Sequence, residues 1–335
     1  YIPITRGELW DESEEKKNRR LAIYAVLNEV LKTLDILIHP FCPYTSEHLY
    51  QTVFEGKQSI LLDKWPQYEE SLVNEKIEES FDIMKDVVSI SSAARMKGKL
   101  KRRWPLNEAQ ICVKKNQKIK LESLSDLLKS QLNVEKFNIV ETEKESGLEQ
   151  LLELKELGLP VKSTLELERK KIGPKAKQHM GKLVTTFSET DPDEIILSIQ
   201  KDGKYDFKID DEVISLDKED FIVDFDSKDN FAVSKREGFV VFISTSRNKE
   251  MMAKGLVKDI ARRLQTLRKE RGYNPTDVLE VASILELDGE SLEMIKGRDE
   301  ELAFLVRVKK VNFEESCKEY KDDDIDGQKI KIAVE

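Results

Sequence analysis

Apolar side chains recur at intervals of three and four residues in the first part of the chain. The clearest stripe lies between residues 21 and 38 and predicts a helix with one apolar face. The stripe consists of Leu21, Tyr24, Leu27, Leu31, Leu34 and Ile38. His39-Pro40 ends this helix, and further helices are predicted from Thr45 to Gly56 and from Asn74 to Met96. Residues 1–104 are therefore predicted to form an antiparallel helical bundle.

After Pro105 the pattern changes to short strands that alternate with helices. The predicted strands are 109–113, 134–140, 163–167, a meander over 205–244, 278–285 and 306–313, and the predicted helices are 121–131, 148–157, 172–187, 249–271 and 292–302. The predicted fold class is thus a multidomain protein, helical and then α+β. We assign residues 105–190 to a strand-helix-strand domain with following helices, and residues 191–335 to a C-terminal α+β domain.

Two parts of the chain share the same order of elements. Ala94-Arg95 lies in a basic helix that is followed by Pro105 and by strand, helix and strand. Ala261-Arg262 lies in a second basic helix that is followed by Pro275 and the same three elements. The repeated order predicts a structural duplication that presents two similar basic edges.

Charge is distributed unevenly along this acidic chain. Its net charge is −9, yet residues 95–103 hold six cations and no acid. Trp104 follows directly, and cations beside an aromatic ring suit a surface that binds phosphate and stacks an unpaired base. Two structural alternatives remain open. The cations could favour the negative end of the helix dipole, and Trp104 could pack in the seam between two domains.

The composition excludes several classes of protein. Hydrophobic residues make up 39% of the chain and charged residues 36%, and no apolar run is long enough to cross a membrane. The three cysteines are too far apart to suggest a disulfide framework, which favours a reducing cytoplasm. Phosphate-binding glycine motifs are absent. His39, Cys42 and His48 lie close in sequence, but we interpret them as packing residues of a helical hairpin and predict no metal site.

Several stretches resemble a known family. The pattern from Asn18 to Tyr24, the turn His39-Pro40-Phe41-Cys42-Pro43 followed by Thr45-Ser46-Glu47-His48-Leu49-Tyr50, and Trp65-Pro66 are similar to the anticodon-binding bundle of class I aminoacyl-tRNA synthetases. The order of further segments resembles isoleucyl-tRNA synthetases of the archaeal and eukaryotic type. These segments are Ala93-Ala94-Arg95, Lys101 to Leu106, Leu132 to Glu135, Ile172 to Lys175 and Ile260 to Glu270.

The resemblance implies a noncatalytic C-terminal half that recognises the anticodon stem and loop of isoleucine tRNA. The nucleotide-binding signatures of class I catalysis do not occur in the sequence, and the chain begins without Met. We therefore expect a monomeric fragment without cofactors of its own, whose missing N-terminal catalytic domain uses ATP and Mg²⁺ and is also its partner. The predicted tRNA-binding residues are Lys97, Lys99, Lys101, Arg102, Arg103, Trp104, Arg19, Arg20, Arg262, Arg263, Arg268 and Lys269.

Two other interpretations stay open at this point. The chain could be the equivalent part of another class I synthetase, such as a valyl enzyme. It could also be a noncatalytic scaffold whose basic helices bind acidic proteins, in which case no tRNA selectivity is expected.

Overall fold

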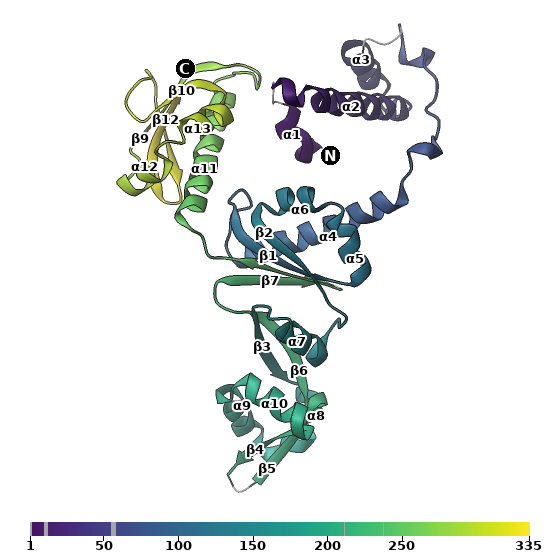
Figure 1. Ribbon diagram of the computed structural model, residues 1–335, viewed down its shortest axis with the longest axis vertical. Helices are drawn as coiled ribbons and strands as arrows, with labels where there is room; N and C mark the ends of the chain where they lie inside the picture. The colour runs from purple at the N-terminus through teal and green to yellow at the C-terminus, as the bar shows by residue number, and fades with distance from the viewer. Residues whose placement is uncertain (1, 10–12, 55–57, 211, 237) are drawn as a thin grey trace. The chain divides into compact units, whose positions relative to one another are not determined.

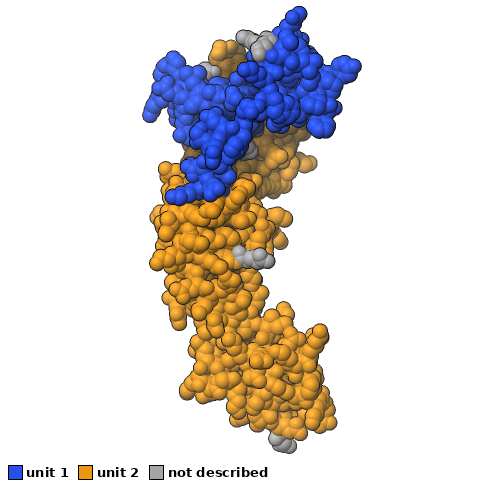
Figure 2. Space-filling model, turned by 90° about the vertical axis from the view of Figure 1, so that its right-hand side faces the viewer, with its two compact units in different colours: residues 1–78 blue, residues 79–335 orange. Residues whose placement is uncertain are grey.

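The computed structural model divides into two compact units, residues 1–78 and 79–335 (Figure 1, Figure 2). The described residues are 2–9, 13–54, 58–210, 212–236 and 238–335.

The first unit is made of helices. These are α1 (Ile2–Leu9), α2 (Lys17–Ile38), α3 (Pro43–Val53) and the short 3₁₀ helices η1 (Glu14–Lys16), η2 (Ile60–Leu62) and η3 (Glu70–Leu72). Pro43 occupies the first turn of α3, where its missing N–H costs no hydrogen bond. Helix α3 ends at Val53. The predicted end of this helix at Gly56 lies outside the described residues.

The buried ring of Tyr50 connects α3 to the loop that follows it. Its hydroxyl donates to Asp63 Oδ2 at 2.6 Å, and Lys32 Nζ of α2 lies 3.1 Å from the same oxygen. These contacts, the tyrosine hydrogen bond above all, hold the pKa of Asp63 well below its usual range. The three side chains therefore join α2, α3 and the loop within the first unit.

The predicted apolar stripe of α2 is largely exposed within this unit. Leu21 is 56% exposed and Leu34 is 49% exposed, whereas Ile23, which is not part of the stripe, is buried. The reason is that α2 packs against α1 and α3, and neither covers the stripe. The helices themselves are as predicted, but the bundle arrangement remains a prediction.

Most of helix α4 (Glu75–Lys97) packs on a sheet of the second unit. Its buried residues Met84, Val87, Ile90 and Ala94 share one hydrophobic core with the strands of the second unit. The division between units consequently falls at Glu78, before most of α4. The predicted domain boundary at residue 104 stays a prediction.

The first sheet of the second unit has the strand order β2-β1-β8-β7. Strands β1 (Leu106–Val113) and β2 (Val134–Glu141) are parallel, and β8 (Phe239–Ser244) and β7 (Phe231–Arg236) continue the sheet in antiparallel fashion. The helix predicted between β1 and β2 is in fact two, α5 (Lys115–Glu122) and α6 (Ser125–Leu132). We call α4 and these strands and helices the first module.

A second sheet, with the order β10-β9-β12-β11, repeats this arrangement. Its parallel pair is β9 (Leu279–Leu285) and β10 (Val308–Asn312), and β12 (Gln328–Val334) and β11 (Lys321–Ile325) are antiparallel. Helix α11 (Lys249–Glu270) precedes the sheet, and α12 (Gly289–Ile295) and α13 (Asp299–Val306) connect the parallel strands. We call these elements the second module.

A lobe of residues 142–230 is inserted in the chain of the first module after β2 and before β7 (Figure 1). Its elements are α7 (Gly147–Glu156), β3 (Val161–Leu167), α8 (Arg169–Ala176), η4 (Lys177–His179), α9 (Met180–Glu189), α10 (Pro192–Asp202), β4 (Lys204–Ile209), β5 (Glu212–Asp217), η5 (Lys218–Asp220) and β6 (Phe221–Ser227). The helix predicted from 172 to 187 is interrupted at Lys177, whose φ is 43°.

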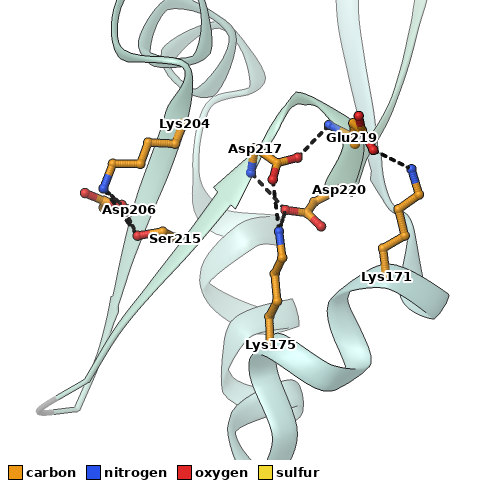
Figure 3. Close-up of polar contacts among 8 residues, drawn as sticks. All are labelled: Lys171, Lys175, Lys204, Asp206, Ser215, Asp217, Glu219 and Asp220. Carbon is orange, nitrogen blue, oxygen red and sulfur yellow. Dashed lines mark hydrogen bonds and ion pairs between the residues drawn. The ribbon is translucent and has the colours of Figure 1, made fainter.

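An ion-pair cluster fixes α8 to the turn between β5 and β6 (Figure 3). Lys175 Nζ contacts Asp220 Oδ2 and lies 3.1 Å from Asp217 Oδ2. The buried Asp220 carboxylate also accepts the backbone N–H of Asp217 at 2.8 Å. The charges of these basic and acidic groups are thus paired within the lobe, where they join α8 to the turn between β5 and β6.

The predicted duplication is confirmed in detail by two buried arginines. Arg95 donates to the carbonyls of Lys101, Trp104, Leu132 and Asn133 at 2.8–3.2 Å. Arg268 donates to the carbonyls of Asn274, Asp277, Val306 and Arg307. The sequence intervals are 6, 9, 37 and 38 residues in the first set and 6, 9, 38 and 39 in the second. Each guanidinium therefore ties a helix end, a turn and the start of a parallel strand together.

The hydrogen bonds correct the correspondence that the sequence predicted. Arg95 corresponds to Arg268, not to Arg262, so the earlier alignment was wrong by six positions. With the corrected alignment, the residues equivalent to 97–103 are 270–276, Glu-Arg-Gly-Tyr-Asn-Pro-Thr, which contain one cation. The second module therefore lacks the matching basic edge that we expected.

Replacing either buried arginine with methionine should remove a side-chain donor from four carbonyls, of which two in each set still accept a backbone N–H. We expect Arg95→Met and Arg268→Met each to lower the free energy of unfolding by about 2–3 kcal/mol, as urea denaturation would measure. Arg262→Met, an exposed change on α11, should alter it by less than about 0.5 kcal/mol. Equal stabilities for Arg268→Met and Arg262→Met would contradict the assigned role.

Candidate nucleic-acid interface

Three of the predicted cations are exposed around the end of α4. Lys97, Lys99 and Arg102 are exposed, and none forms an ion pair or side-chain hydrogen bond with a residue that the structure describes. Their charges are therefore available to an external anion.

The backbone of this segment places Lys99 in a strained conformation. Leu100 N donates to Arg95 O at 2.8 Å and Lys99 N donates to Met96 O at 3.1 Å, which is a Schellman motif. Lys99 consequently has a φ of 54°, a left-handed value that favours glycine. The equivalent position in the second module is Gly272, with a φ of 79°. A lysine thus occupies the first module's cap at a cost in stability.

Lys101, Arg103 and Trp104 instead converge on one buried carboxylate. Lys101 Nζ and Trp104 Nε1 lie 2.8 and 2.9 Å from Asp259 Oδ2, and Arg103 Nε contacts Asp259 Oδ1. The Asp259 side chain is only 2% exposed, and Lys101 also pairs with Asp326. These contacts join the basic segment to α11 and the β11–β12 turn, so the two predicted phosphate ligands already have anionic partners.

The ring of Trp104 packs against α11 at Gly255. A methyl group at Gly255 would lie 3.0–3.3 Å from atoms of the indole, so only glycine lets the helix approach this closely. The Arg247 guanidinium carbon lies 4.1 Å from the ring centroid and Lys101 Nζ lies 4.9 Å from it. These contacts agree with the alternative that the sequence left open, in which Trp104 packs in the seam between two domains. Stacking of a base on Trp104 stays an untested prediction.

The predicted cations of α11 divide into three kinds. Arg262 and Lys269 are exposed and form no ion pair with a described residue, whereas Arg263 Nη1 lies 3.3 Å from Asp323 Oδ1. Arg268 is 5% exposed and gives its donors to backbone carbonyls. The folded module therefore already uses this side chain internally, and contact of Arg268 with phosphate stays an untested prediction.

Arg19 lies on α2 in the first unit. It is 70% exposed and its Nη2 donates to Glu8 Oε1 of α1 at 3.1 Å. Arg20 is the next residue of the same helix and is partly buried. Binding of phosphate by Arg19 would compete with an exposed ion pair, which is typically weak.

The structure also shows cations that the sequence analysis did not select. Lys129, Lys254 and Lys258 line one hollow in the second unit. Two of them lie on α11, but Lys129 lies on α6, and no spacing in the sequence relates the two helices. In the described part of the chain, no group of three His, Cys, Asp or Glu could hold a metal ion, and no helix is long and apolar enough for a membrane span.

Comparisons with known proteins bear on these surfaces. Residues 1–111, which end within β1, match the model of the anticodon-binding domain of tRNA ligase. The matched segment is about a third of the chain. It contains α4 and the whole basic stretch, together with Arg19 and Arg20.

Curated relatives extend the similarity to nearly the whole chain. An isoleucine–tRNA ligase of Pyrococcus furiosus is 28% identical over 94% of the chain and 28% of its own length. Those of Methanocella arvoryzae and Methanothrix thermoacetophila are 26% and 27% identical over all of the chain and 30% and 31% of their own lengths. The resemblance to archaeal-type isoleucyl-tRNA synthetases is confirmed, and the chain spans less than a third of these relatives.

The Asp259 carboxylate should make the contact between the basic segment and α11 sensitive to acid. Burial alone would raise the pKa of Asp259, but hydrogen bonds from Lys101, Arg103 and Trp104 outweigh burial and hold the pKa below its usual value. A lowered pKa stabilises the fold above the unfolded-state value of about 4, and this contribution is lost as the pH falls through the folded-state pKa.

We therefore expect Asp259→Asn to lower the free energy of unfolding by about 2 kcal/mol at pH 7. The difference from the unchanged chain should shrink as denaturation is repeated down to pH 3. Asp326→Asn is the matched control, since its half-exposed carboxylate also pairs with Lys101. A difference that does not vary with pH would show that the charge of Asp259 is not responsible.

Proposed function

We propose that this chain recognises the anticodon stem and loop of isoleucine tRNA as part of an isoleucine–tRNA ligase. The observation that carries the proposal is the exposed, unpaired set of Lys97, Lys99 and Arg102 inside the segment that matches the anticodon-binding family. The archaeal relatives are isoleucine–tRNA ligases, which supports the choice of tRNA.

In this proposal the chain contributes binding and orientation, and the chemistry takes place elsewhere. Adenylation with ATP and Mg²⁺ is assigned to a catalytic domain whose signature motifs this sequence does not contain. Contacts with the anticodon region would hold the acceptor end in position for that domain. We further propose that the protein acts in the cytoplasm as a monomer in which its own catalytic domain is its protein partner.

The conformation of Lys99 supports a role beyond folding. The equivalent cap is glycine, which takes a positive φ without steric cost, whereas a lysine with this backbone is disfavoured by about 1 kcal/mol. Strain retained at one position is consistent with a side chain that is needed for binding.

The first experiment compares binding of the chain to isoleucine tRNA and to a copy with a changed anticodon, at two salt concentrations. A preference for the native anticodon that persists at higher salt is expected. Equal and salt-sensitive binding of both tRNAs would leave only a generic basic surface. If valine tRNA were also measured and bound more tightly than isoleucine tRNA, a valyl enzyme would be favoured.

Removing the three exposed cations should weaken tRNA binding and its dependence on salt. For Lys97→Ala/Lys99→Ala/Arg102→Ala, we expect the slope of log affinity against log salt to fall by about 2 units, because each phosphate contact contributes about 0.7–0.9. The control is Lys162→Ala/Lys201→Ala/Lys208→Ala, three exposed lysines of the lobe. An unchanged slope in the first variant would exclude this segment from the interface.

Lys99→Gly separates binding from folding at a single position. It should raise the free energy of unfolding by up to about 1 kcal/mol, because the strain at this cap is relieved. It should also weaken tRNA binding, since one cation is lost. Urea denaturation and a salt titration of tRNA binding measure the two effects, and a variant that is more stable yet binds equally well would contradict the role of Lys99.

A further inference from the structure

A hollow of about 400 Å³ lies where the two modules of the second unit meet. The first module contributes Pro105 and Asn133 with Lys129 and Glu135, and the second contributes Glu301 with two lysines of α11, Lys254 and Lys258. The hollow therefore depends on how both modules pack within this unit.

The ammonium group of Lys258 is half-buried at this hollow. Lys254 lies 2.8 Å from Glu250 and 3.6 Å from Glu135, but Lys258 makes no hydrogen bond and no ion pair within 4 Å with a described residue. Burial, followed by the charges of Lys254 and the clamping guanidinium of Arg95, lowers the pKa of Lys258, although Glu301 opposes the shift. A half-buried cation without a partner is costly, and an anion entering the hollow would remove that cost.

The surroundings of the hollow suit a phosphate that is attached to a larger molecule. Lys129 is exposed at the hollow and also has no ion-pair partner among the described residues. Arg102, one of the exposed cations, accepts a hydrogen bond from Asn133 Nδ2 through its carbonyl at 3.2 Å. Glu135 also lines a second hollow, of about 640 Å³, together with Asn107, Asn230 and Asn248 and the carboxylates of Glu108 and Asp229.

We propose that the hollow between the modules binds a phosphate group through Lys258, with Lys129 and Lys254 as further cations, and that this phosphate belongs to an RNA backbone. The choice of RNA over a small phosphorylated molecule rests on the proposed function. The phosphate site itself rests on the unpaired lysine and the geometry of the hollow. The second hollow, lined by both asparagines and carboxylates, gives room for the attached nucleoside.

The site can be probed in the full chain by the rate at which Lys258 is acetylated, followed by mass spectrometry. We expect inorganic phosphate and isoleucine tRNA each to slow this reaction. Lys310, an exposed lysine of β10, is the internal control and should react at the same rate throughout. Slowing by phosphate but not by tRNA would overturn the RNA source and leave a site for a small phosphorylated molecule. No slowing by either ligand would overturn the site.

Substitution gives an independent test. Lys258→Met should lower the salt slope of tRNA binding by about 0.7–0.9 and Lys258→Arg should restore it, whereas Lys310→Met should change nothing. Anticodon-dependent binding that Lys258→Met leaves unaltered would overturn the RNA assignment alone. If the unchanged chain binds no tRNA, the proposed function fails, and protection of Lys258 by phosphate still decides the site.

Discussion

The second unit depends on a buried guanidinium in each of its two modules. Arg95 and Arg268 each bind four backbone carbonyls that lie at the end of a helix, in the following turn and before a parallel strand. Two carbonyls of each set also accept a backbone N–H, as Asn133 O does from Leu106 and Arg307 O does from Leu279, and the arginine supplies the remaining donors. Arginine fits since its planar group presents several donors, and burial lowers the pKa of Arg95 only to about 10, so it remains charged at neutral pH.

The same turn has acquired different surfaces in the two modules. In the first module it carries exposed cations and a lysine in a left-handed conformation, whereas the second has Gly272 and a nearly uncharged turn. The hydrogen bonds of Arg95 and Arg268 fix the backbone of this turn in both modules, so the side chains at the turn can vary without loss of the fold. The first module's turn is thereby free to bind a charged partner, and Asp259 holds its remaining cations against α11.

Local patterns predicted most elements of this fold, because periodicity depends on neighbouring residues. The strands over 134–140 and 278–285 and the helix over 249–271 lie within two residues of their observed ends. Contacts between distant residues were not predictable in this way. The pairing of Lys101 with Asp259 spans 158 positions, and nothing in the basic run indicates which cations are already neutralised. Arg268 looked like a surface cation because its position in a basic helix does not reveal that the carbonyls of a later strand surround it.

The lobe between β2 and β7 has a consequence for the entropy of the unfolded chain. The second module joins its equivalent strands with residues 313–320, whereas the first module uses residues 142–230. If the longer connection were unstructured, closing it would cost about 2 kcal/mol more than closing the shorter one. Its own core, which includes Phe207 and Leu216 and extends to Phe242 of the sheet, offsets this entropic penalty. The lobe can thus be regarded as a folded linker, whose internal stability keeps the ends of β2 and β7 within reach of each other.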